Sequence, residues 1–300
     1  PGVDMLTIIK SYDLPEEFPD DVLAQAEIAS AKLDDDEIGR RMDLTKQCVY
    51  TIDPADAKDH DDAISVERTV DGYRLSVHIA DVSYFVDDGT ALDKEAFRRG
   101  NSVYLPGMII PMLPEILSND VCSLKPNRKR LTHSIIIDFD KHGKAIKWFM
   151  ADTIIKSQAK LAYEEVQEFF DTGEVKPKLK RIADNLKLAR RLALLLNKRR
   201  FADGSLDFDL PESKIILNKK GDGAVRVRTP RNPVRQTGWQ RPGFVIAVIT
   251  GGGHKLCQAF PPRGVILGLR HDPCVTKMVE KGHEVGPAAK KLRRQGGEID

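Results

Sequence analysis

Alternating apolar and polar positions in the first two thirds of the chain predict a β-sheet. Five segments show this two-residue period: residues 46–52, 63–69, 73–82, 132–139 and 144–156. Asp71 and Gly72 form a turn signal between two of these segments, and residues 141–143 form another, so a hairpin is predicted at each place. Two further strands are predicted at 206–210 and 214–217.

Other segments repeat their apolar residues at the 3.6-residue period of an α-helix. These segments are residues 22–32, 91–99, 163–170 and 179–200. Gly100 is expected to end the second helix, because glycine readily adopts the backbone conformation that follows a helix. In the longest helix, Ile182, Leu186 and Ala189 fall on one apolar stripe, and most lysines and arginines fall elsewhere, where we expect solvent.

Two stretches are predicted to be irregular. Residues 1–19 contain Pro15 and Pro19 and are interpreted as a loop, and the acidic run at 34–37 is expected to end the helix before it. Residues 102–120 hold too much proline for regular structure but are too apolar for a solvated loop, so we expect them to lie against the core. The predicted fold class is α+β, with a mixed or mostly antiparallel sheet core flanked by helices.

Composition narrows the class of protein. The chain has 300 residues, of which 41% are hydrophobic, and this is enough for one large core or two small ones. We expect a cytoplasmic monomer without a membrane partner, because no apolar run is long enough to span a bilayer and no signal peptide opens the chain. The chain does not begin with methionine, so flanking sequence is expected. Four cysteines without Cys-x-x-Cys spacing predict buried thiols.

One segment between two predicted strands is strongly acidic. TIDPADAKDHDDAIS, residues 51–65, holds five aspartates within ten positions. Neighbouring carboxylates repel one another by about 1 kcal/mol per pair in water, and by more when they are partly buried. Two interpretations stay open: a surface loop whose side chains point into water, or a site for a hard divalent cation. The flanking strands favour the second, because they hold the ends of the loop near the core.

Mg²⁺ or Mn²⁺ is the expected cation, since both prefer oxygen ligands. An EF-hand is excluded, because the loop lacks the central glycine and the glutamate at the twelfth position. Cations of this kind serve phosphoryl transfer, so the expected substrate is a phosphodiester or a phosphoanhydride. We interpret His78, on a later predicted strand, as a hydrogen-bonded core residue rather than a metal ligand.

Three motifs carry a family resemblance. In chain order they are TIDPADAKDHDDAIS, VHIADVSYFV and RGNSVYLPGMIIPMLPEILSNDVCSL, and together they closely resemble the RNB domain of the ribonuclease II and ribonuclease R family. The opening PGVDMLTIIKSYDLPEEFP is similar to the linker of ribonuclease R. The resemblance implies a hydrolase that depends on Mg²⁺, with Mn²⁺ possible, and that degrades single-stranded RNA from its 3′ end to nucleoside 5′-monophosphates.

The same resemblance implies particular site residues. The aspartates that match the catalytic and metal-binding set are Asp53, Asp59, Asp61 and Asp62, and the role implied for Asp61 is to orient rather than to coordinate. Tyr104 matches an aromatic residue that stacks on the 3′-terminal base, a contact that contributes about 1–3 kcal/mol. The candidates for phosphate contacts are Arg98, Arg99, Arg128 and Arg130. Solvation without RNA contact is the alternative for these arginines, since basic surface runs are usually solvated.

The resemblance also divides the chain into three parts. Residues 1–44 are a linker and helix leading into the catalytic domain, residues 45–232 are the RNB domain core, and residues 233–300 are a disturbed continuation. The family has a long helix here, which Pro233 and the glycines at 251–253 could not sustain. A reading-frame disturbance or a decayed gene copy would explain the change. The alternative function is therefore a catalytically inactive RNA-binding or metal-binding remnant.

Overall fold

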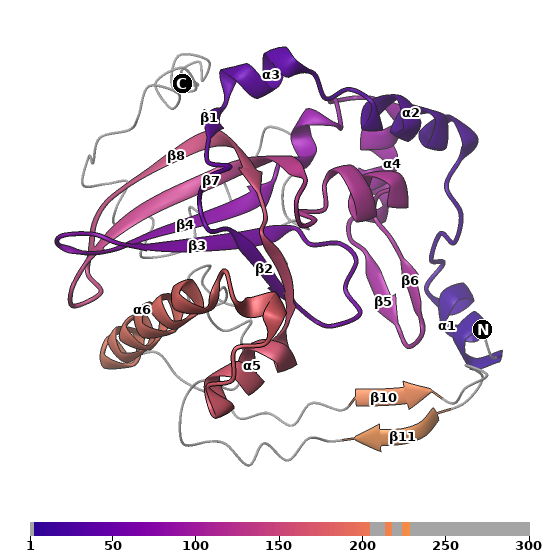
Figure 1. Ribbon diagram of the computed structural model, residues 1–300. Helices are drawn as coiled ribbons and strands as arrows, with labels where there is room; N and C mark the ends of the chain where they lie inside the picture. The colour runs from indigo at the N-terminus through magenta and orange to yellow at the C-terminus, as the bar shows by residue number, and fades with distance from the viewer. Residues whose placement is uncertain (1–2, 205–213, 218–223, 229–300) are drawn as a thin grey trace.

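The computed structural model in Figure 1 describes residues 3–204, 214–217 and 224–228. Its strands are β1 (Met42–Asp43), β2 (Tyr50–Asp53), β3 (Asp62–Arg68), β4 (Gly72–Ala80), β5 (Val103–Leu105), β6 (Met108–Ile110), β7 (Lys129–Asp140), β8 (Ala145–Lys156), β9 (Ala159–Ala162), β10 (Lys214–Leu217) and β11 (Ala224–Arg228). Its α-helices are α1 (Val3–Ser11), α2 (Asp20–Ser30), α3 (Asp35–Arg40), α4 (Ala91–Arg99), α5 (Tyr163–Thr172) and α6 (Ala183–Ala202). The short turns of helix are η1 (Val82–Tyr84), η2 (Leu117–Val121) and η3 (Pro177–Leu179).

Seven strands form one curved sheet in the order β1-β8-β7-β4-β3-β2-β9 (Figure 1). Most neighbours are antiparallel, whereas β1 pairs with β8 and β2 pairs with β9 in parallel. The two predicted hairpins are confirmed as β3–β4 and β7–β8. The predicted α+β class, with a mixed sheet flanked by helices, is confirmed as well.

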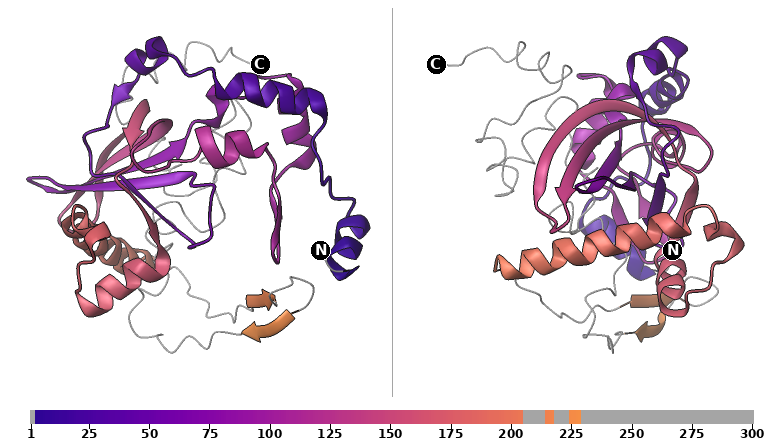
Figure 2. Two further views of the ribbon diagram at one scale, coloured as in Figure 1. Left: turned by 45° about the vertical axis from the view of Figure 1, so that its right-hand side comes forward. Right: turned by 60° about the vertical axis from the view of Figure 1, so that its left-hand side comes forward.

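Each face of the sheet carries its own apolar core, because neighbouring side chains on a strand point to opposite faces. Ile64 of β3 lies in the first core with Leu186 and Ala189 of α6. Ala63, the preceding residue, lies in the second core with Ala26 of α2. Figure 2 shows α6 running along one side of the sheet, with α2 and α4 on another side. The predicted apolar stripe on α6 is thus confirmed.

All four predicted helices are present. They correspond to α2, α4, α5 and α6. Gly100 follows α4 with a φ of 73°, in the region that favours glycine, so the predicted end of this helix is confirmed. The side chain of Thr90 caps the other end of α4 by accepting a hydrogen bond from the N–H of Asp93.

The prediction of a loop over residues 1–19 is wrong for residues 3–11 and confirmed for residues 12–19. Helix α1 lies there, and its Ile9 is fully buried. The prolines that suggested a loop lie beyond the end of α1 and do not interrupt it. The acidic run at 34–37 also does more than follow a helix, because Asp34 begins α3 by accepting a hydrogen bond from the N–H of Glu37 at 2.6 Å.

Residues 102–120 hold more regular structure than predicted. They include the hairpin of β5 and β6, with Pro106 and Gly107 between the strands. Gly107 has a φ of 77°, which a residue with a side chain rarely adopts, so the turn depends on glycine. The expected packing against the core is confirmed farther along, where Leu117 is fully buried.

Three other strand predictions have different outcomes. The strand predicted over 46–52 begins only at Tyr50, because the residues before it form a turn. The strand at 214–217 is confirmed as β10, which pairs antiparallel with β11. The strand predicted at 206–210 lies outside the described residues.

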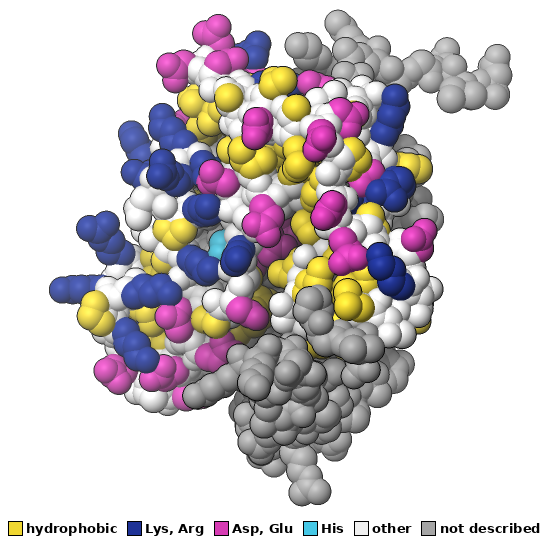
Figure 3. Space-filling view, turned by 90° about the vertical axis from the view of Figure 1, so that its right-hand side faces the viewer, with side chains coloured by type: hydrophobic (Ala, Val, Ile, Leu, Met, Phe, Trp, Pro, Cys, Tyr) yellow, Lys and Arg dark blue, Asp and Glu magenta, His cyan; other side chains and the backbone are white. Residues whose placement is uncertain are grey.

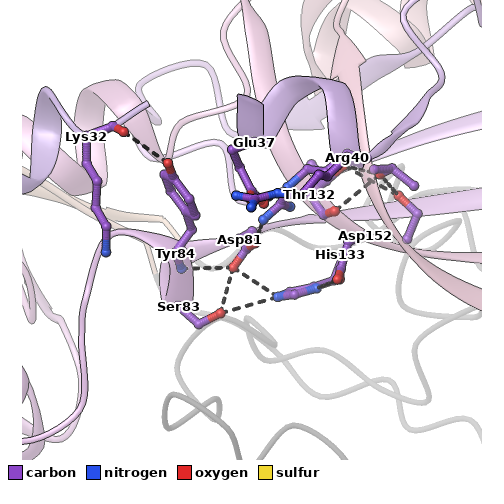
Figure 4. A network of polar contacts seen from close by, with 12 residues as sticks. Lys32, Glu37, Arg40, Asp81, Ser83, Tyr84, Thr132, His133 and Asp152 are labelled. Atoms are coloured by element: carbon purple, nitrogen blue, oxygen red, sulfur yellow. Dashed lines mark hydrogen bonds and ion pairs between the residues drawn. The ribbon is translucent and has the colours of Figure 1, made fainter. Parts of the chain in front are cut away.

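A partly buried ionic network joins α3 to the sheet (Figure 4). Arg41, whose side chain is 5% exposed, donates to Asp81 Oδ2 at 2.6 Å and to Glu37 Oε1 at 2.7 Å. His133 of β7 lies between two carboxylates, with Nε2 2.9 Å from Asp81 Oδ1 and Nδ1 2.7 Å from Asp152 Oδ1. Positive and negative groups therefore alternate through the network.

This alternation sets the protonation states of the network. Burial alone would lower the pKa of His133, but hydrogen bonds to Asp152 and Asp81 outweigh burial and raise the pKa to about 9. Burial alone would raise the pKa of Asp81, but the hydrogen bond from His133 and neighbouring positive charge hold it well below its ordinary value. At neutral pH, His133 is therefore the cation and Asp81 the anion.

Other buried side chains test the remaining predictions about the core. His78 is fully buried, its Nδ1 lies 2.7 Å from Ser134 Oγ, and burial lowers its pKa to about 3. Its interpretation as a hydrogen-bonded core residue is confirmed. Cys122 is a buried free thiol as predicted, whereas Cys48 is half-buried, and the other two cysteines lie outside the described residues. Within the described ranges, every helix is too short or too polar to cross a bilayer.

Candidate functional site

The acidic loop lies between two adjacent strands, as predicted. β2 ends at Asp53 and β3 begins at Asp62, and the strands pair antiparallel with Tyr50 opposite Ile64. Both ends of the loop are therefore held by the sheet. The four predicted catalytic aspartates consequently occupy one short segment at one end of the sheet (Figure 1).

Asp53 is the most buried of these aspartates, with 8% of its surface exposed. Its Oδ2 lies 2.7 Å from Nδ1 of His60, which is 2% exposed. A buried carboxylate without a polar partner is costly, and this contact supplies one. One oxygen of Asp53 is thus held by a residue of the same loop.

Side chains and backbone from neighbouring strands fix the loop. Lys160 of β9 donates from Nζ to the carbonyl of Ala57 at 2.6 Å. The N–H of Ala80, the last residue of β4, donates to the carbonyl of Asp61 at 2.9 Å. The loop is therefore attached at two points to the strands around it.

Ser123, which follows η2, makes a third attachment. Its Oγ donates to the carbonyl of Lys58 at 2.8 Å and accepts from the N–H of His60 at 3.1 Å. Leu124 adds a backbone hydrogen bond from its N–H to the carbonyl of His60 at 2.7 Å. Sequence reasoning did not single out His60, Ser123 or Lys160. The position of His60 inside the acidic run was a usable signal, whereas Ser123 is remote in sequence and gave none.

Tyr104 lies beside the acidic loop. It belongs to β5, is 45% exposed, and donates from its hydroxyl to Asp59 Oδ2 at 2.6 Å. The structure therefore brings together two residues that the family resemblance selected separately, although 45 positions separate them in the chain. The aromatic ring keeps an exposed surface next to a carboxylate of the loop.

Arg98 and Arg99 of α4 have different environments. Arg98 is 57% exposed in its side chain and makes a bidentate ion pair with Glu95. Arg99 is 1% exposed in its side chain and donates to Glu95 and to the carbonyls of Pro111 and Glu17. These contacts favour a packing role for Arg99 and leave Arg98 on the surface.

Arg128 and Arg130 differ in the same way. Arg128 is exposed. Arg130 is 13% exposed in its side chain and donates to the carbonyls of Ser123 and Asp120, at 2.8 and 3.1 Å. Burial lowers the pKa of Arg130, and Asp120 acts against that effect. The side chain of Arg130 thus supports the segment that holds the acidic loop.

The donor chemistry of the loop fits a hard divalent cation, because its carboxylates offer only oxygen ligands. The geometry does not gather a complete set, since among the described residues no group of three histidine, cysteine, aspartate or glutamate side chains converges to hold a metal ion. Figure 3 shows carboxylates near the middle of one face, with most lysines and arginines to its left. To bind a cation, the carboxylates of the loop would therefore have to move closer together.

Comparison with known proteins agrees with the arrangement of these motifs. The family model for the RNB domain matches residues 41–237. Ribonuclease R 1 of Lactococcus lactis is 41% identical over 222 residues, which cover 73% of this chain and 27% of that protein. Ribonuclease R of Thermotoga maritima is 41% identical over 225 residues, which cover 74% of this chain and 32% of that protein.

A solved structure has a similar fold. It is described as Mycoplasma genitalium RNase R in complex with ribose methylated single-stranded RNA, and it matches with a TM-score of 0.71 and 30% identity. The match covers 75% of this chain and 35% of that one. This chain thus spans less than a third of the length of either curated relative.

Proposed function

The chain belongs to the RNB-domain family, and from that premise we propose that it forms the catalytic part of a 3′-to-5′ exoribonuclease. The proposed reaction is the hydrolysis of single-stranded RNA to nucleoside 5′-monophosphates. The observation that supports it most is the contact of Tyr104 with Asp59, which places an exposed aromatic ring against the acidic loop. A ring for the terminal base and carboxylates for the adjacent phosphodiester are the two parts that cleavage at an RNA end requires. Cytoplasmic location and a monomeric state stay predictions.

Mg²⁺, with Mn²⁺ as a substitute, is the proposed cofactor. The proposed ligands are Asp53, Asp59, Asp61 and Asp62, among which Asp61 serves mainly to orient. When bound, such a cation stabilises charge on a phosphodiester and makes water a stronger nucleophile at neutral pH. The buried bond between His60 and Asp53 keeps one carboxylate oxygen fixed, and the other oxygen is the proposed ligand.

The protein's own residues would bind the RNA end. We propose that the ring of Tyr104 stacks on the terminal base, which tolerates any sequence because every base has an aromatic face. The exposed guanidinium groups of Arg98 and Arg128 are the proposed phosphate contacts. Arg99 and Arg130 would act indirectly, by holding the segments on which the binding residues lie.

The test is a cleavage assay on the purified chain. We expect mononucleotides to be released from a labelled oligoribonucleotide in the presence of Mg²⁺ and to disappear when EDTA is added. RNA binding without release would favour the alternative, an RNA-binding protein without activity. That alternative has one observation in its favour, because the described carboxylates do not gather into a complete metal site.

Substitution of Tyr104 separates stacking from hydrogen bonding. Tyr104→Ala is expected to weaken binding of a single-stranded oligoribonucleotide by about 1–3 kcal/mol, because it removes the stacking surface. Tyr104→Phe keeps the ring and removes the hydroxyl that donates to Asp59, so its affinity should stay near that of the unmodified chain. Fluorescence anisotropy in the presence of EDTA measures binding without cleavage.

Tyr12→Ala is the matched control, because Tyr12 is another exposed tyrosine, at 76% exposure. Equal loss in the Phe and Ala variants would argue against stacking.

A further inference from the structure

The residues that hold the acidic loop come from a distant part of the chain. Ser123 lies 65 positions from Lys58 and 63 from His60 and bonds to both. Its single hydroxyl donates to one backbone group and accepts from another, and alanine could make neither bond. With the backbone bond from Leu124 to His60, three hydrogen bonds join the two segments. We call Ser123 and Leu124 the loop clamp.

The loop clamp is itself rigidly placed. Ser123 is 1% exposed and Leu124 is fully buried in the second core. Arg130 donates to the carbonyl of Ser123, so the strand β7 holds the clamp from the other side. Hydrogen bonds among buried groups are costly to break, because water cannot easily replace them. Because the loop clamp is packed in the core and bonds to the backbone of the acidic loop, it fixes the loop backbone relative to the core.

His60 connects the loop clamp to the carboxylate of Asp53. Its backbone N–H and C=O are both bonded to the loop clamp, and its side chain bonds to Asp53. Both ends of this connection are buried, since His60 is 2% and Asp53 8% exposed. A chain of hydrogen bonds thus runs from Ser123 through His60 to Asp53.

We propose that Ser123 and His60 are positioning residues for the acidic loop, which set where its carboxylates can meet a divalent cation. The proposal rests on the proposed function, because it assumes that the carboxylates of the loop bind the cation. Residues that hydrogen-bond metal-binding carboxylates orient them, and their loss commonly reduces metal affinity by about 10–100-fold. Neither residue needs to touch the cation or the RNA for this effect.

Hydrogen/deuterium exchange tests the clamp without any cation. In Ser123→Ala, we expect backbone amides in residues 58–61 to exchange at least about tenfold faster, because the clamp loses two of its bonds. Ser118→Ala is the matched control, since Ser118 lies in the same segment and bonds only to carbonyls of its own turn. Thermal unfolding identifies a general loss of stability, which would raise exchange throughout the sheet. Unchanged exchange in residues 58–61 would overturn the proposal.

Mn²⁺ binding tests the connection to Asp53. Measured by electron paramagnetic resonance, His60→Leu is expected to bind Mn²⁺ about 10–100-fold more weakly, because Asp53 then loses the hydrogen bond that orients its carboxylate. His60→Asn should bind within about threefold of the unmodified chain, since its amide can donate from nearly the same place as Nδ1. A purely structural histidine would give no rescue by asparagine.

The two measurements separate failure of this proposal from failure of the proposed function. If the unmodified chain binds no Mn²⁺, the proposed cofactor site fails, and with it the positioning of metal ligands, even if exchange confirms the clamp. If the unmodified chain binds Mn²⁺ and His60→Leu binds equally well, the positioning role alone is overturned. Weak binding in His60→Leu, recovery in His60→Asn and faster exchange in Ser123→Ala together support the proposal.

Discussion

Asp61→Asn is expected to slow the release of mononucleotides from single-stranded RNA by about 10²-fold or more. The exchange keeps the shape of the side chain and removes its negative charge. Asp61 is held in place by its own backbone, whose carbonyl accepts from Ala80, so the loop should keep its conformation. Loss of one preorganised electrostatic group in an active site commonly costs 10²–10³-fold in rate. The measurement is the initial rate of release with Mg²⁺ in excess.

Asp56→Asn is the matched control for this prediction. It removes the same charge from the same loop, but Asp56 is exposed and stands outside the proposed ligand set. Its rate should stay within about threefold of the unmodified chain, since charges exposed to solvent have small effects. If this chain releases no product, the corresponding exchanges in the full-length Thermotoga maritima relative provide the comparison. If both variants released product more slowly than the unmodified chain, and by the same factor, the total charge of the loop rather than Asp61 would determine activity.

Arg41→Ala is expected to lower the free energy of unfolding by about 3–5 kcal/mol. The substitution removes the guanidinium that joins Asp81 to Glu37 and leaves the buried carboxylate of Asp81 and the partly buried carboxylate of Glu37 without this partner. His133 would still bond to Asp81, so the loss should fall toward the lower end of this range. Urea unfolding followed by circular dichroism measures the change.

The adjacent arginine provides the control. Arg40 also pairs with Glu37, at 2.6 Å, but its side chain is 71% exposed. Arg40→Ala should therefore leave the unfolding midpoint nearly unchanged, because exposed ion pairs contribute little to stability. A similar loss in both variants would mean that the helical segment as a whole, rather than the buried ion pair, accounts for the effect of Arg41.

Local patterns predicted the parts of the fold that local physics determines. The strands β3 and β4 and the helix α4 followed from apolar periodicity, a turn signal and a glycine after the helix. The helix α1 was missed because two later prolines dominated the interpretation of the first 19 residues. The hairpin β5–β6 was missed because its strands have only three residues each, too few to show a period.

Some residues of the candidate site were predicted from the sequence, and others were found only in the structure. Family resemblance selected the four aspartates and Tyr104, and the structure places Tyr104 against one of the aspartates. The contribution of Ser123 depends on hydrogen bonds to residues more than 60 positions away, which no local pattern encodes. His60 lies only seven positions from Asp53, so its place in the acidic run was a signal that could have been used. Burial of Arg99 was equally invisible, because a basic residue at the end of a helix is usually exposed.

The packing of α2 has a practical consequence for anyone preparing a shorter recombinant version. The family model begins at residue 41, after α2 has ended. Yet Val22 and Ala26 of that helix are 2% and 0% exposed and close the second core, and Arg99 lies 3.6 Å above the ring of Phe18 just before it. An expression clone trimmed to the model boundary would retain every proposed ligand and still expose an apolar surface to water, so aggregation of such a product would say nothing about its chemistry.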